Sequence, residues 1–145
     1  MRILHVEDDD AHAEITRRIL AADDPNRARL IHVSDGQQAL DYFEACRAHA
    51  QSANHEDQLP DLVLLDLRLP KVDGLEVLRR LKAAPDTKTI PVVILSTSEA
   101  ATDRAAAYEG GASSYLTKPA ELRLFVDMVA SFAGYWVTWN RYAHD

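Results

Sequence analysis

Short apolar runs alternate with longer, partly polar segments along the whole chain. In the runs the apolar residues follow one another, which is typical of strands, whereas in the longer segments they recur every three or four residues, which is typical of helices. This pattern predicts five strands, at residues 2–6, 28–33, 61–67, 91–96 and 113–117. It also predicts five helices, at residues 12–22, 36–50, 74–84, 99–110 and 120–142.

The regular alternation of strand and helix indicates the fold class. The middle strands, "DLVLLDL" (61–67) and "PVVILS" (91–96), are almost entirely apolar, as expected for strands that are covered on both faces. We therefore expect an α/β fold in which helices cover both faces of a doubly wound, five-stranded parallel sheet. Such sheets bind their ligands at the carboxyl ends of the strands, so the polar residues found there are the first candidates for function.

Charged and hydroxyl side chains stand at the carboxyl ends of four predicted strands. They are Glu7 and Asp8 after the first strand, Asp66 in the third, Ser96 in the fourth and Lys118 after the fifth. Three carboxylates at one edge repel each other unless a cation joins them. Mg²⁺, a hard cation that binds carboxylate oxygens and accepts phosphate oxygens, is the natural partner. The pattern therefore predicts a magnesium site beside a lysine.

This set of residues suggests phosphoryl chemistry. A carboxylate such as Asp66 can attack phosphorus to form an aspartyl-phosphate. A metal ion and Lys118 would neutralise the charge of the transferring group, and the Ser96 hydroxyl would hydrogen-bond a phosphoryl oxygen. Taken singly, each residue has an ordinary explanation as a helix cap, a turn residue or a solvated side chain. Their convergence at one edge of one sheet favours a functional site.

Composition narrows the function classes. A length of 145 residues fits a single domain over residues 1–145, and the formal net charge of −7 argues against binding nucleic acid through its phosphates. The single cysteine, Cys46, excludes an internal disulfide and suits a reducing compartment. No apolar stretch reaches the roughly 20 residues that span a bilayer, and the N-terminal apolar run is too short for a signal peptide. We therefore expect a cytoplasmic protein without membrane contact.

Five segments carry a resemblance to a known family. "ILHVEDD", "VSDGQQAL", "VLLDLRLPKVDG", "IPVVILST" and "GASSYLTKPAE" stand in the order found in the receiver domains of two-component response regulators, and the chain resembles them from residue 2 to about 133. The resemblance implies a flavodoxin-like sheet with strand order 2-1-3-4-5. It also implies phosphorelay signalling, in which a sensor histidine kinase transfers a phosphoryl group to the domain and the domain changes its surface.

The same resemblance implies a role for each site residue. Asp66 is the phosphoacceptor, and Lys118 contacts the phosphoryl group. Glu7, Asp8 and Asp66 hold Mg²⁺ together with the backbone carbonyl of Arg68, with Asp8 ligating more directly and Glu7 through a water molecule. The bond between Lys118 and Pro119 is cis in this family, which would place the lysine in the site.

Two further sets of residues take roles from the resemblance. Ser96 is the switch hydroxyl and Tyr115 the switch aromatic. Arg68, Thr97 and Ser98 stand at positions that tune the lifetime of the phosphate. Serine at 96 and glutamate at 7 are departures from the more frequent threonine and aspartate.

The C-terminal segment predicts an interface. No further domain is expected, so the chain resembles a stand-alone receiver with an aromatic helical extension over residues 134–145. The polar segment 48–60 and "FAGYWVTWNR" are similar to the small regulators of phytochrome-type histidine kinases. We expect a homodimer through helix 99–110, strand 113–117 and the last helix, with Tyr135, Trp136 and Trp139 in the interface. The alternative is that these aromatic residues pack on their own domain.

Two other functions compete with a phosphorelay switch. A metal-dependent phosphohydrolase also forms an aspartyl-phosphate, but the usual signature has a second aspartate two residues after the nucleophile, where this chain has Arg68. A degenerate receiver used only as a scaffold would not need the complete set of acidic residues, Ser96 and Lys118. We therefore expect a protein that catalyses only its own phosphorylation and dephosphorylation.

Overall fold

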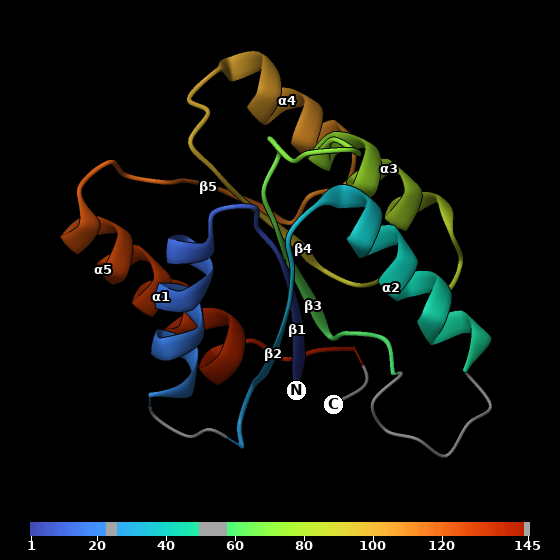
Figure 1. Ribbon diagram of the computed structural model, residues 1–145, viewed down its shortest axis with the longest axis horizontal. Helices are drawn as coiled ribbons and strands as arrows, with labels where there is room; N and C mark the ends of the chain where they lie inside the picture. The colour runs from blue at the N-terminus through green and yellow to red at the C-terminus, as the bar shows by residue number, and fades with distance from the viewer. Residues whose placement is uncertain (23–25, 50–57, 144–145) are drawn as a thin grey trace.

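The computed structural model describes residues 1–22, 26–49 and 58–143, and its centre is a parallel sheet (Figure 1). The strand order is β2-β1-β3-β4-β5, which confirms the predicted doubly wound sheet. The strands are β1 (Arg2–Val6), β2 (Arg29–Val33), β3 (Leu62–Leu65), β4 (Val92–Ser96) and β5 (Ser114–Thr117). The α-helices are α1 (Asp10–Ala21), α2 (Gly36–Ala48), α3 (Gly74–Ala83), α4 (Ala101–Glu109) and α5 (Leu122–Ala133).

Helices cover both faces of the sheet. Helices α1 and α5 lie on one side, and α2, α3 and α4 lie on the other (Figure 1). Strand β3 shows why its sequence is continuously apolar: Val63 and Leu65 pack toward α2, α3 and α4, whereas Leu62 and Leu64 pack toward α1 and α5. All four side chains are buried. Each face of the sheet thus closes its own hydrophobic core, as a sheet with helices on both faces requires.

The hydrogen-bond ladder continues past the ends of several strands. The Glu7 N–H donates to the Val33 carbonyl at 3.0 Å, and the Asp66 N–H donates to the Val6 carbonyl at 3.1 Å. Past the ends of β4 and β5, the Lys118 N–H donates to the carbonyl of Ser96 at 2.7 Å. Because these residues follow their strands directly, the ladder brings them to one edge of the sheet.

The last helix differs from the prediction of one continuous helix over 120–142. Helix α5 passes at Gly134 into a π-helical segment, η2 (Gly134–Trp139), and the chain is not helical from Asn140 to residue 143. The Asn140 N–H donates to the Tyr135 carbonyl at 2.7 Å, which is the i to i+5 bond of a π-turn. The Tyr142 hydroxyl donates to the Trp136 carbonyl at 2.7 Å. The chain therefore folds back because these bonds satisfy carbonyls at the helix end.

The polar segment 48–60 is described only in part. Helix α2 ends at Ala48, two residues before the predicted end. Residues 50–57 lie outside the described residues.

Candidate functional site at the carboxyl edge of the sheet

Three carboxylates gather where β1 and β3 end. One oxygen from each of Glu7, Asp8 and Asp66 lies within 4.8 Å of the other two. Glu7 and Asp66 are buried and follow neighbouring, hydrogen-bonded strands, whereas Asp8 is exposed. Oxygen ligands from two buried carboxylates and one exposed carboxylate suit a hard divalent cation that keeps part of its water shell.

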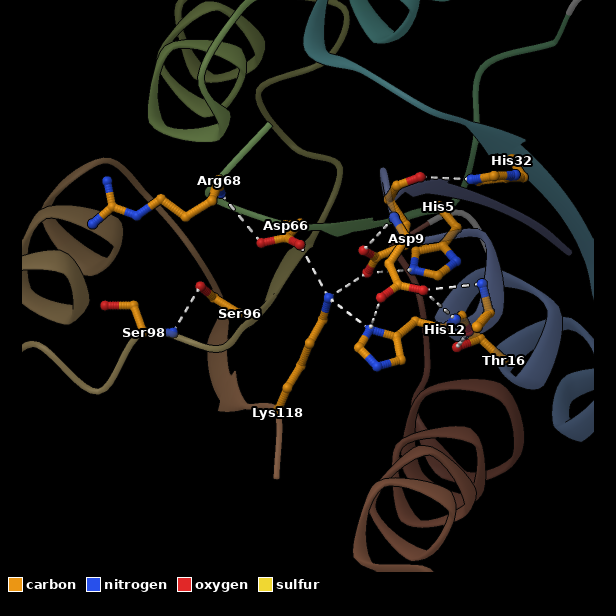
Figure 2. A network of polar contacts seen from close by, with 12 residues as sticks. His5, Asp9, His12, Thr16, His32, Asp66, Arg68, Ser96, Ser98 and Lys118 are labelled. Atoms are coloured by element: carbon orange, nitrogen blue, oxygen red, sulfur yellow. Dashed lines mark hydrogen bonds and ion pairs between the residues drawn. The ribbon is translucent and has the colours of Figure 1, made fainter. Parts of the chain in front are cut away.

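Lys118 points to Asp66 (Figure 2) and also contacts Glu7. Its Nζ donates to Glu7 Oε2 at 2.6 Å and to Asp66 Oδ2 at 3.0 Å, and it lies 3.4 Å from His12 Nδ1. The lysine is buried, so pairing with carboxylates is what makes its charge tolerable there. Burial acts to lower the pKa of Lys118, but the hydrogen bonds and charges of Glu7 and Asp66 raise it above its ordinary value. The ammonium group stays protonated beside Asp66.

Burial outweighs the opposing contacts at Glu7. It raises the pKa of Glu7 to about 7, aided by the nearby charge of Asp66 and opposed by the bonds from Lys118. The Asp9 N–H also donates to Glu7 Oε1 at 3.1 Å. A metal ion at this carboxylate would therefore compete with a proton near neutral pH.

The lysine reaches the site without the expected cis bond. No peptide bond among the described residues is cis, so the bond between Lys118 and Pro119 is trans and that expectation is wrong for this structure. The position of Lys118 follows instead from the sheet, because its N–H pairs with the Ser96 carbonyl directly after β5.

The loop after Asp66 packs tightly around the carboxylate. The Arg68 N–H donates to Asp66 Oδ1 at 3.2 Å, and the Gly74 N–H donates to the Leu67 carbonyl at 2.9 Å. A Cβ on Gly74 would lie 2.1 Å from the Asp66 carbonyl oxygen, so only glycine allows α3 to begin this close to β3. Lys71 has a positive φ of 67°, which helps turn the loop from strand to helix.

Comparison with known proteins decides the family. The family model for the response regulator receiver domain matches residues 3–130. The chain belongs to this family. It is 40% identical over 139 residues to the probable methanogenesis regulatory protein FilR2 of Methanothrix harundinacea, covering 96% of this chain and 85% of that protein. It is 38% identical over 136 residues to response regulator Rcp1 of Synechocystis, covering 93% and 88%.

Solved structures agree with the sequence comparison. The Mn²⁺-bound form of Rcp1 matches with a TM-score of 0.83 at 36% identity, over 97% of both chains. The phosphorylated cyanobacterial phytochrome response regulator RcpA matches with a TM-score of 0.86 at 34% identity, over 98% of this chain and 97% of that one. These receivers support phosphorelay signal transduction as the function, and no comparison favours a phosphohydrolase. Receiver domains bind a divalent metal in an acidic pocket. The three carboxylates of this chain form a pocket of that kind.

Ser98 connects the two predicted switch residues, Ser96 and Tyr115. Ser96 is buried, and its Oγ accepts from the Ser98 N–H at 3.2 Å. The Tyr115 hydroxyl donates to the Ser98 carbonyl at 2.9 Å. The two predicted switch residues are therefore linked by the backbone of one residue between them. Thr97, the other predicted tuning position, is exposed.

Sequence reasoning missed three histidines, His5, His12 and His32, which all lie to one side of Asp66 and Lys118 (Figure 2). His5 is 1% exposed, and among the described residues neither of its ring nitrogens has a hydrogen-bond partner. Burial, then the charges of His32, Lys118 and His12, lowers the pKa of His5 to about 3, so the ring is neutral. His32 Nε2 lies 2.7 Å from the Glu7 carbonyl oxygen. The available signal was a polar residue inside the apolar run "ILHV".

Two further aspartates lie near the site, and the contacts of each show its structural role. Asp9 is the N-cap of α1, where its side chain accepts from the N–H groups of Ala11 and His12. Asp103, in the first turn of α4, accepts from Arg68 and Ser98. Nothing in the spacing of Asp103 relative to Asp66 signals this contact, because it depends on how α4 is placed.

The predicted interface aromatics divide into two groups. Trp136 is partly buried and packs against the core between the sheet and α5, as the alternative prediction held. Tyr135 and Trp139 are 55% and 75% exposed. Two of the three residues thus remain available to a partner. Among the residues that the structure describes, no helix combines the length and the hydrophobicity needed to cross a membrane.

Proposed function

We propose that this receiver accepts a phosphoryl group from a sensor histidine kinase onto Asp66 in a Mg²⁺-dependent reaction. The observation that carries the proposal is the placement of Asp66, whose carboxylate lies beside Glu7 and Asp8 and 3.0 Å from the Lys118 ammonium. Similarity to RcpA, a phytochrome response regulator, over nearly the whole chain supports a phytochrome-type kinase as the donor.

The reaction uses the charges of the pocket. An Asp66 carboxylate oxygen attacks the phosphorus of the kinase phosphohistidine, the P–N bond breaks, and the histidine leaves with the bonding electron pair. Lys118 neutralises charge on the phosphoryl oxygens. Glu7, Asp8, Asp66 and the Arg68 carbonyl would hold Mg²⁺, which supplies further neutralisation of phosphoryl charge when it is bound.

Phosphorylation would then change the surface. We propose that Ser96 turns toward the new phosphoryl oxygen and that Tyr115 moves into the space it leaves. The link of both residues to Ser98 supports this coupling, since a shift of the Ser96 hydroxyl disturbs the residue that holds the Tyr115 hydroxyl. The affected surface would be that of α4 and β5. Together with α5 and the exposed side chains of Tyr135 and Trp139, this surface would form a homodimer interface. The protein would act in the cytoplasm.

The test is phosphotransfer to the Asp66→Asn variant. A phosphorylated histidine kinase should label the wild-type chain with one acid-stable, base-labile phosphate, and the variant should take no label because it lacks the nucleophile. Thermal unfolding of both proteins checks that the substitution leaves the fold intact. Labelling of the variant at the wild-type rate would contradict Asp66 as acceptor. Sustained turnover of an external phosphoester would favour the phosphohydrolase instead.

A further inference from the structure

One carboxylate joins the two loops that flank the phosphoacceptor. The Arg68 guanidinium donates to Asp103 Oδ2 at 2.6 Å, and the Ser98 hydroxyl donates to the same oxygen at 2.5 Å. Arg68 follows Asp66 by two residues, and Ser98 follows Ser96 by two residues. The Asp103 side chain is only 15% exposed. Its bond with Ser98 is partly buried, whereas its bond with Arg68 lies at the surface.

This bridge sets the direction of the arginine. The Arg68 backbone N–H touches the Asp66 carboxylate at 3.2 Å, so the side chain begins beside the phosphoacceptor. The guanidinium nevertheless extends away from Asp66 (Figure 2) to reach α4. The Arg68 side chain is 65% exposed, so the ion pair with Asp103, rather than packing, orients it.

An arginine freed from that pair would have a second partner within the site. A guanidinium presents several N–H donors in a planar fork that matches phosphoryl oxygens and carboxylates equally well. A phosphoryl group on Asp66 would add such oxygens beside the residue from which the Arg68 side chain starts. The two anions, Asp103 and the phosphoryl group, would therefore compete for one cation.

We propose that Asp103 is a positioning residue that holds Arg68 away from the phosphoryl group and so keeps the aspartyl-phosphate open to hydrolysis. The proposal rests on the proposed role of Asp66. In hydrolysis, the oxygen of water attacks phosphorus, the bond from phosphorus to the Asp66 oxygen breaks, and the carboxylate leaves with the electron pair. The product is inorganic phosphate, and the proton of water passes to solvent. A guanidinium folded over the solvent side of the phosphoryl group obstructs this water.

The test is a double-mutant cycle between Asp103→Asn and Arg68→Ala, read as the lifetime of the phosphate. Each full-length protein is labelled by a phosphorylated kinase, the kinase is removed, and the loss of label from Asp66 is followed. Asparagine keeps the shape of Asp103 and still accepts from the Ser98 hydroxyl, but it lacks the charge that pairs with Arg68. We expect Asp103→Asn to lengthen the lifetime about fivefold, which corresponds to about 1 kcal/mol. In the Arg68→Ala background we expect less than about a twofold change.

A matched control removes a charge elsewhere on the same helix. Glu109→Gln deletes one negative charge at the far end of α4, and its lifetime should equal that of the wild type. An unchanged or shorter lifetime in Asp103→Asn would overturn the proposal, as would an equal lengthening with and without Arg68, which indicates a merely structural effect. Failure of this proposal can be distinguished from a wrong assignment of Asp66. If Asp66 were not the phosphoacceptor, the Asp66→Asn chain would still take label.

Discussion

At the scale of single residues, the receiver site depends on carboxylates with different environments. Glu7 is buried beside Lys118, and burial raises its pKa to about 7, whereas Asp8 is exposed to solvent. A carboxyl group with a raised pKa holds its proton up to that pH, so below pH about 7 a metal ion bound at Glu7 would have to displace that proton. His5 stays neutral in this range because its pKa is lowered to about 3.

We therefore expect Mg²⁺ binding to release a proton. At pH 6 the release should approach one proton per site, and it should fall toward zero at pH 8, because Glu7 is then already ionised. Calorimetric titration in buffers with different heats of ionisation measures this number directly. Glu7→Gln is the control, since it cannot release this proton. Equal release at both pH values would show that Glu7 does not titrate in this range.

At the scale of elements, the close approach of α3 to β3 positions the phosphoacceptor. A Cβ at Gly74 would lie 2.1 Å from the Asp66 carbonyl oxygen and 2.6 Å from the Leu67 Cα. These neighbours are backbone atoms, which cannot move without shifting Asp66 itself. Gly134, at the passage from α5 to η2, has ordinary helical dihedral angles, and a Cβ added there would meet nothing within 4 Å among the described residues.

The two glycines should respond to alanine in opposite directions. Gly74→Ala should destabilise the domain by more than about 2 kcal/mol and slow phosphotransfer, because overpacking displaces the strand end. Gly134→Ala should stabilise it by up to about 1 kcal/mol, since alanine favours the helical backbone. Urea unfolding measures both changes. A loss of stability in Gly134→Ala would indicate that the bend into η2 requires glycine.

At the scale of the whole molecule, the C-terminal tail, residues 134–143, has an exposed aromatic surface next to a partly buried anchor. Trp136 packs on the core between the sheet and α5, whereas Trp139 is 75% exposed. Large exposed aromatic residues are typical centres of interface energy. The structure thus separates a residue that holds the tail in place from one that is exposed to solvent.

Sedimentation of two tryptophan variants distinguishes these roles. Trp139→Ala should shift a micromolar dimer toward monomer while leaving the unfolding free energy of the monomer within about 0.5 kcal/mol. Trp136→Ala should lower that free energy by about 1–3 kcal/mol, because it removes a partly buried ring. If the wild-type chain is monomeric both with and without phosphate, the homodimer is wrong. If Trp139→Ala is also destabilised, the tail belongs wholly to the core.

The pattern of the sequence determined the order of the elements, the parallel sheet and the edge of that sheet that carries the functional site. The spacing of apolar residues in helices and the apolar runs of strands are local properties of the sequence. Because parallel strands end at one edge of the sheet, the residues at their carboxyl ends are expected to lie together. Glu7, Asp8, Asp66 and Lys118 were all identified in this way, and the structure places them side by side. The strand order, implied by the family resemblance, is confirmed as well.

Only the tertiary structure decided the contacts between residues that no local pattern relates. The pairing of Arg68 and Ser98 with Asp103, the histidines around Glu7, and the fold-back of the tail through Tyr142 all depend on how helices are set against the sheet. The raised pKa of Glu7 belongs to the same class, since desolvation exists only once the core has closed around the carboxylate. Periodicity reports which face of an element is buried, but the orientation of a polar side chain at an edge is set by partners that are distant in the chain.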